Sequence, residues 1–150
     1  MNRRNFIKLP VLAAVASLPL LSVQAFAAKP IYKSWTGLAV GGYDTVAYFT
    51  MGKPVEGSSE FSVEHNGATW RFASAEHRDL FVANPEKYAP QYGGHCAYAM
   101  AKGSLASVVP EAWDIVDGRL FLNYSLGVQK LWRGDRDNFI VAADQEWPKF

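Results

Sequence analysis

Cysteine is almost absent from this chain of 150 residues, which has Cys96 as its single thiol. One cysteine cannot form a disulfide within the chain. It also cannot supply the four-cysteine or the two-cysteine, two-histidine ligand set of a structural zinc site. Both classes of protein are therefore excluded, and the fold must depend on its hydrophobic core.

An excess of charge of one sign is also lacking, since 15 Lys and Arg stand against 14 Asp and Glu. Arg3, Arg4 and Lys8 are the only charged residues among the first 27, so the rest of the chain carries twelve basic and fourteen acidic residues. Without a basic block, the chain lacks the electrostatic footprint of a protein that binds nucleic acid or an anionic membrane surface. We expect neither as a partner.

A long hydrophobic run is missing as well. The apolar stretch at 9–23 is shorter than the roughly 20 residues of a transmembrane helix, and two prolines interrupt it. It follows the basic segment RRNFIK, which resembles a twin-arginine export signal, and it precedes the small-x-small sequence AFA at 25–27. We therefore predict a signal peptide at 1–27, cleaved after Ala27, and a periplasmic protein without a membrane span after cleavage. An uncleaved anchor is the alternative.

The rest of the chain is long enough for one compact domain. We predict a lead-in segment at 28–40 and the domain at 41–147. Two pairs of alternating apolar and polar runs flank Asn66-Gly67 and Asp117-Gly118, residue pairs that favour tight hairpin turns. The sequence therefore predicts two β-hairpins.

Helices are predicted in two separate blocks, at about 74–83, where Ser74 is the N-cap, and at about 125–147, which Gly134 divides in two. Hairpins and helices in separate blocks indicate an α+β fold with a small antiparallel sheet built from the hairpins. The stretch GGYDTVAYF at 41–49 is predicted as a short strand or an ordered loop. The expected core residues of the last block are Leu131, Trp132, Phe139, Ile140 and Ala143.

Five motifs follow one another along the chain: GGYDTVAYF, GKPVEG, F-x-V-x-x-N-G-x-x-W-x-F-x-S, NPEKYAPQYGGHCAYAMAKG and WDIVDGRLFLNY. Together they resemble the YHS domain family in its exported single-domain form. The resemblance implies metal binding, with copper as the expected metal and zinc as the less favoured one, in metal trafficking or resistance. It implies no known reaction. The chain departs from metal-binding relatives in its single cysteine, and it has His95 where similar sequences often have tyrosine.

The segment QYGGHCAYAM at 91–100 holds the candidate site. A thiolate binds metal ions and attacks electrophiles, and imidazole together with thiolate suits copper or zinc. The glycine pair leaves room beside the thiol and can turn backbone N–H groups toward it. Cys96 and His95 are therefore the predicted metal ligands, with Met100 and His77 as further candidates. A reactive thiol and a buried cysteine that only packs remain the alternatives.

Local geometry decides which of these side chains can meet. In an extended segment, His95 and Cys96 point to opposite faces, so they could share an ion only if the glycine turn reached Cys96. Cys96 and Met100 come within about 6 Å of each other only if the segment between them is helical.

A small pocket is predicted beside the thiol, with aromatic walls and few polar groups. Asp44 either caps a turn through its side chain or hydrogen-bonds toward the cysteine loop. The predicted pocket residues are Tyr43, Asp44, Tyr48, Tyr92, Gly93, Gly94 and Tyr98.

Three functions follow from these alternatives: a metal-binding module, a thiol enzyme or redox sensor with Cys96 as nucleophile, and a non-catalytic interaction domain. The second needs a base beside the thiol, and the sequence shows no Cys–His–Asp arrangement. An accessible Cys96 near a second donor favours the first function, an accessible Cys96 without one favours the second, and a buried Cys96 favours the third. The candidate partners are a metal ion, a small ligand or another periplasmic protein.

Overall fold

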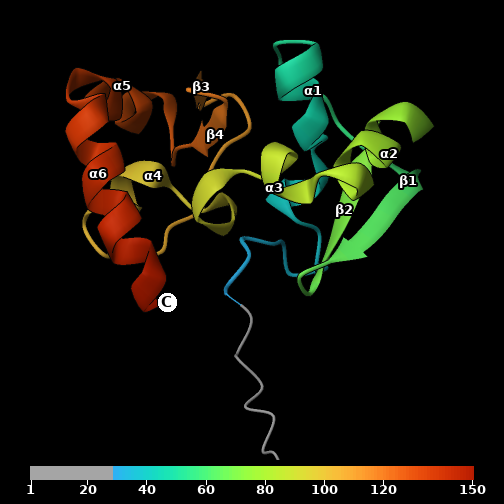
Figure 1. Ribbon diagram of the computed structural model, residues 1–150, viewed down its shortest axis with the longest axis horizontal. Coiled ribbons are helices and arrows are strands. Elements are labelled where there is room, and N and C mark those ends of the chain that lie inside the picture. The colour runs from blue at the N-terminus through green and yellow to red at the C-terminus, as the bar shows by residue number, and fades with distance from the viewer. Residues whose placement is uncertain (1–28) are drawn as a thin grey trace, which may run out of the picture.

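The structure is a computed structural model that describes residues 29–150 (Figure 1). The predicted signal peptide at 1–27 and its cleavage site lie outside the described residues. Between residues 29 and 150, no helix combines the length and the apolar character that crossing a membrane requires.

Short helices and two β-hairpins alternate along the chain. In chain order the elements are η1 (Val40–Gly42), α1 (Thr45–Thr50), β1 (Ser58–His65), β2 (Ala68–Phe72), α2 (Ala75–Ala83), α3 (Pro85–Tyr88), η2 (Gln91–Gly94), α4 (Ala97–Ala101), β3 (Trp113–Val116), β4 (Arg119–Leu122), α5 (Leu126–Gly134), α6 (Arg136–Glu146) and η3 (Trp147–Lys149). Figure 1 shows α1, α2 and α3 gathered around the first hairpin, and α4, α5 and α6 beside the second. The α+β prediction is confirmed.

Both hairpins turn where the sequence predicts. Asn66 and Gly67 have φ of 50° and 76°, and Asp117 and Gly118 have φ of 50° and 74°, the positive values that a tight turn of this kind requires at both positions. The β1–β2 and β3–β4 pairs are antiparallel but form two separate two-stranded sheets, not one.

The predicted helix blocks are present. Ser74 caps α2 by accepting a hydrogen bond from the N–H of His77 at 3.1 Å, and the last block divides at Gly134 into α5 and α6. One expected core residue is wrong. Leu131 is 59% exposed because α5 turns Trp132, which is fully buried, toward the core, and the side chain of the preceding residue then points outward.

The stretch GGYDTVAYF contains a helix, so the predicted strand or loop is wrong there. Asp44 is the N-cap of α1, and its Oδ1 accepts a hydrogen bond from the N–H of Ala47 at 3.1 Å. A side-chain cap satisfies a backbone donor that would otherwise lack a partner at the helix start. This contribution and the burial of Val46 and Tyr48 outweigh the strand preference of Val, Tyr and Phe.

Two clusters of buried side chains form the core, and β4 lies between them. Leu120 and Leu122 belong to the cluster that contains Trp70 and Phe81, which we call the first core. Phe121, on the opposite face of the same strand, belongs to the second core, which contains Tyr92, Ala97, Met100, Trp132 and Ala143. Because a strand alternates its faces, one short strand contributes to both cores.

Candidate functional site

Cys96 follows a turn in which residues 92–94 all adopt left-handed backbone, with φ of 58°, 62° and 84°. Gly93 is required there for two reasons. Its φ is positive, and a Cβ at this position would lie 2.2 Å from the carbonyl oxygen of Pro30. The N–H of Tyr32 also donates to the carbonyl of Gly93 at 2.8 Å. The lead-in segment is therefore packed directly against the turn that precedes the thiol.

The thiol of Cys96 is a hydrogen-bonded core group, and the residue is only 1% exposed. Its Sγ accepts a hydrogen bond from the N–H of Tyr124 at 3.3 Å and donates one to Oδ1 of Asn123 at 3.5 Å. The same Oδ1 accepts the N–H of Tyr98 at 3.1 Å. Cys96 thus links the start of α4 to the end of the second hairpin, and its sulfur is shielded from solvent.

His95 points away from this thiol. Its ring packs against Tyr32 and Trp147, with centroid distances of 5.9 and 6.4 Å. Nδ1 lies 2.9 Å from the carbonyl oxygen of Tyr92, and because a carbonyl only accepts, Nδ1 carries the proton and Nε2 has the lone pair in the neutral ring. Burial lowers the pKa of His95, against the opposing effect of this hydrogen bond, and so favours the neutral form.

Met100 is in helical register with Cys96, as the proposed sulfur pair requires, since α4 spans Ala97–Ala101. Both residues are buried, but they pack into different cores. Cys96 belongs to the first core and Met100 to the second. The helix therefore supplies the required spacing without placing the two side chains in one cluster.

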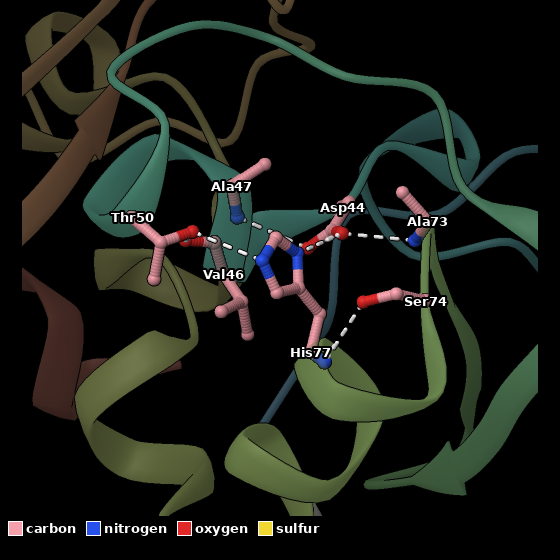
Figure 2. A network of polar contacts seen from close by, with 7 residues as sticks. All are labelled: Asp44, Val46, Ala47, Thr50, Ala73, Ser74 and His77. Atoms are coloured by element: carbon pink, nitrogen blue, oxygen red, sulfur yellow. Dashed lines mark hydrogen bonds and ion pairs between the residues drawn. The ribbon is translucent and has the colours of Figure 1, made fainter.

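His77 belongs to a third environment, shown in Figure 2. Its Nδ1 lies 2.6 Å from Oδ2 of Asp44, and its Nε2 lies 3.1 Å from Oγ1 of Thr50. Asp44 is fully buried and also accepts the N–H groups of Ala47 and Ala73, at 3.1 and 2.9 Å. One carboxylate thus joins α1, the end of β2 and α2. The prediction that Asp44 caps through its side chain agrees with this geometry, and its bonds lead to α2 and not to the cysteine loop.

The four predicted metal ligands, Cys96, His95, Met100 and His77, consequently have four different sets of neighbours. Across residues 29–150, no group of three or more His, Cys, Asp or Glu side chains is arranged to hold a metal ion. Their role as ligands stays a prediction, and the structure does not assemble them into one site.

The predicted pocket residues are also dispersed. Tyr48 donates its hydroxyl to the carbonyl of Pro110 at 2.8 Å, and burial raises its pKa well above the ordinary value. Tyr98 packs edge-on against Phe139, and Gly94 is buried within the turn. Tyr43 is half-buried and forms an isolated β-bridge with Glu56.

Tyr92 and Gly93, by contrast, line a cleft of about 390 Å³ whose lining residues do not include Cys96. The tyrosine hydroxyl donates to Asp144 at 2.9 Å, and Arg119 binds both oxygens of that carboxylate at 2.6 and 3.1 Å. Burial would raise the pKa of Asp144, but the hydrogen bonds from Arg119 and Tyr92 outweigh it and lower the pKa. This cluster anchors α6 to the 92–94 turn.

Sequence reasoning missed the partners of the thiol, Asn123 and Tyr124. They lie 27 and 28 positions after Cys96, so no local pattern connects them. Asn123 does carry a signal of its own, since a polar residue directly follows the apolar strand residues 120–122. It is fully buried, and its Nδ2 has no hydrogen-bond partner within the described part of the chain.

A family model of the YHS domain matches residues 46–92, about a third of the chain. YHS domains are associated with metal binding. No significant match was found among curated proteins or among solved structures. The matched segment contains His77 but ends before His95 and Cys96.

Proposed function

We propose that this protein is a non-catalytic interaction domain and that Cys96 is a structural residue of its core. The observation that carries the proposal is the environment of the thiol, 1% exposed and hydrogen-bonded to Asn123 and Tyr124. Free cysteine in such surroundings acts as a small hydrophobic residue with weak hydrogen-bonding capacity. A buried Cys96 is also the outcome that favours an interaction domain over the other two functions.

The alternative of a thiol enzyme or redox sensor is less well supported. A nucleophilic cysteine needs access for its substrate and a base within hydrogen-bond distance. The neighbouring His95 is turned to Tyr32 and Trp147, and its protonated nitrogen is bound to a backbone carbonyl. It therefore does not serve as a base for the sulfur of Cys96.

Metal binding is the second candidate function, and the residues fit it only in part. A copper site shared by Cys96 and His95 does not fit this geometry, because the two side chains diverge. His95 by itself offers the arrangement of a metal-binding imidazole, since a backbone carbonyl fixes Nδ1–H and leaves the lone pair on Nε2, whereas Nε2 of His77 already lies 3.1 Å from Oγ1 of Thr50. We therefore propose weak, single-imidazole binding of copper at His95, with zinc less favoured.

Export to the periplasm is part of the proposal. It rests on the basic RRNFIK segment, the short apolar stretch and the AFA sequence at 25–27. Metal trafficking or resistance is the physiological setting that we propose for copper binding by an exported protein of this family.

Titration with Cu(I), Cu(II) and Zn(II) tests these proposals in protein that has been expressed as the full chain and purified after processing. Wild type is compared with His95→Ala, Cys96→Ser and, as a control outside the site, His65→Ala. We expect weak copper binding that is lost in His95→Ala and kept in the other two variants. Tight one-to-one binding lost in both His95→Ala and Cys96→Ser would overturn the structural role of Cys96.

A further inference from the structure

Trp35 lies in a turn that backbone hydrogen bonds hold in place, and its side chain is exposed to solvent. The residue is 97% exposed, although the backbone around it is fixed. The N–H of Gly37 donates to the carbonyl of Ser34 at 2.8 Å, and the N–H of Ser34 donates to the carbonyl of Leu38 at 2.9 Å. A tryptophan held in this way loses little conformational freedom on binding and brings a large apolar surface, which is why tryptophan is enriched at binding hot spots.

A cleft that could receive such a side chain lies nearby. It has a volume of about 390 Å³, and its apolar lining includes Ile31, Pro90, Tyr92 and Trp147. This volume is near the lower end of the range for small-molecule pockets, about 300–1,000 Å³. It is large enough for one indole ring.

The turn and the cleft belong to the same face of the molecule. Ile31 lines the cleft and lies four residues before Trp35 in the same lead-in segment. Lys33 Nζ donates to the carbonyl of Gly67 at 3.0 Å, and Asn66, in that same hairpin turn, also lines the cleft. A symmetric dimer requires this arrangement, because each copy must offer the anchor and the receiving site on one surface.

The charges of this face complement each other across such a dimer. Lys33 lies two residues before Trp35, and Glu86 and Lys29 both line the cleft, where the ammonium of Lys29 already donates to the carbonyls of Trp147 and Phe150. Within residues 29–150, Glu86 makes no ion pair. With Trp35 of one copy in the cleft of the other, each Lys33 would face a Glu86 of the opposite copy.

We propose that the occupant of the cleft is Trp35 of a second copy of this chain, inserted reciprocally to form a twofold-symmetric dimer. This dimer is independent of the copper binding proposed at His95. Two copies that exchange one aromatic anchor and one ion pair each would associate reversibly, so the dimer fraction depends on concentration.

Sedimentation equilibrium of the processed protein over a wide concentration range tests the proposal, with a chelator present so that metal-bridged species do not form. We expect a monomer–dimer equilibrium in wild type. Trp35→Ala should weaken it by at least about thirtyfold, the minimum loss for a single binding hot spot. Leu131→Ala, which removes an exposed apolar side chain on α5, should leave it unchanged.

A charge swap gives a second readout that does not depend on the indole. Lys33→Glu and Glu86→Lys should each weaken the dimer, and the double variant should recover most of the loss. A wild type that stays monomeric throughout, equal effects of Trp35→Ala and Leu131→Ala, or a double variant no better than the worse single one would overturn the proposal. A small ligand or a different protein in the cleft would produce the first of these results.

Discussion

Removing the carboxylate of Asp44 should destabilise the protein far more than removing an ordinary helix cap. This side chain is fully buried and accepts three hydrogen bonds, from the N–H groups of Ala47 and Ala73 and from Nδ1 of His77. Asp44→Ala therefore detaches α1, β2 and α2 from a shared partner (Figure 2).

The magnitude follows from the three bonds. Loss of a side-chain cap costs about 1 kcal/mol. Losing each of the other two hydrogen bonds, from Ala73 and His77, adds about 1–2 kcal/mol, because the donor had a buried carboxylate as its acceptor and is left without a partner. The total of about 3–5 kcal/mol would be a large part of the 5–15 kcal/mol that stabilises a typical domain.

Urea unfolding of wild type and variants measures this loss, and Ser125→Ala provides the matched control. Ser125 caps α5 through one hydrogen bond, from the N–H of Val128 at 3.1 Å, so its removal should cost only about 1 kcal/mol. Asp44→Asn, which keeps the shape and one acceptor oxygen, should fall between the two. The reasoning is refuted if Asp44→Ala, at an unchanged m-value, loses no more free energy of unfolding than Ser125→Ala.

Other predictions concern the cysteine turn and its surroundings. Gly93→Ala should lower the free energy of unfolding by about 3 kcal/mol or more, because its Cβ would collide with a backbone oxygen 2.2 Å away. Gly67→Ala has a similar φ but open space around it, so it should cost only about 1–2 kcal/mol. Equal losses in urea unfolding would contradict this. Burial lowers the pKa of His95 in the folded protein. The unfolded chain therefore binds more protons near the ordinary value of 6.5, and the free energy of unfolding should rise with pH in that range. His95→Gln should flatten the rise between about pH 5 and 8, and an unchanged slope would count against a buried neutral ring. Hydrogen bonds, led by that from Arg119, outweigh burial and lower the pKa of Asp144. The ionised carboxylate therefore stabilises the fold fully above its ordinary pKa, and this stabilisation is lost as pH falls through the pKa of the folded protein. The stability difference between wild type and Asp144→Asn should shrink as pH drops to about 3, and a constant difference would show that the ion pair is not its source.

Local signals in the sequence were sufficient for much of the fold. The turn pairs at 66–67 and 117–118 need positive φ, and Ser74 can satisfy the first amides of α2, so each of these elements could be predicted from its own residues. The same principle of capping was available for Asp44. The strand preference of the residues after it suggested a strand or loop, and the cap and the burial of α1 decided otherwise.

The candidate site was less predictable because its contacts are distant in sequence. The alternation rule required an extended segment over residues 95–100, whereas only His95 at its start has extended backbone, with φ of −73° and ψ of 160°, and α4 begins at Ala97. The partners of the thiol, however, come from the end of the second hairpin, and the ring of His95 meets Trp147 near the C-terminus. Only tertiary packing brings these residues together.

The reaction rate of the Cys96 thiol with a small reagent, measured in the folded protein and in urea, tests the central claim most directly. A buried sulfur hydrogen-bonded to Asn123 and Tyr124 reacts only when the structure opens, so we predict labelling at least about a thousandfold slower in the folded protein than in the unfolded chain. Labelling at similar rates in both states would show that Cys96 is accessible. It would contradict the structural role of the thiol and would favour metal binding or thiol chemistry at Cys96.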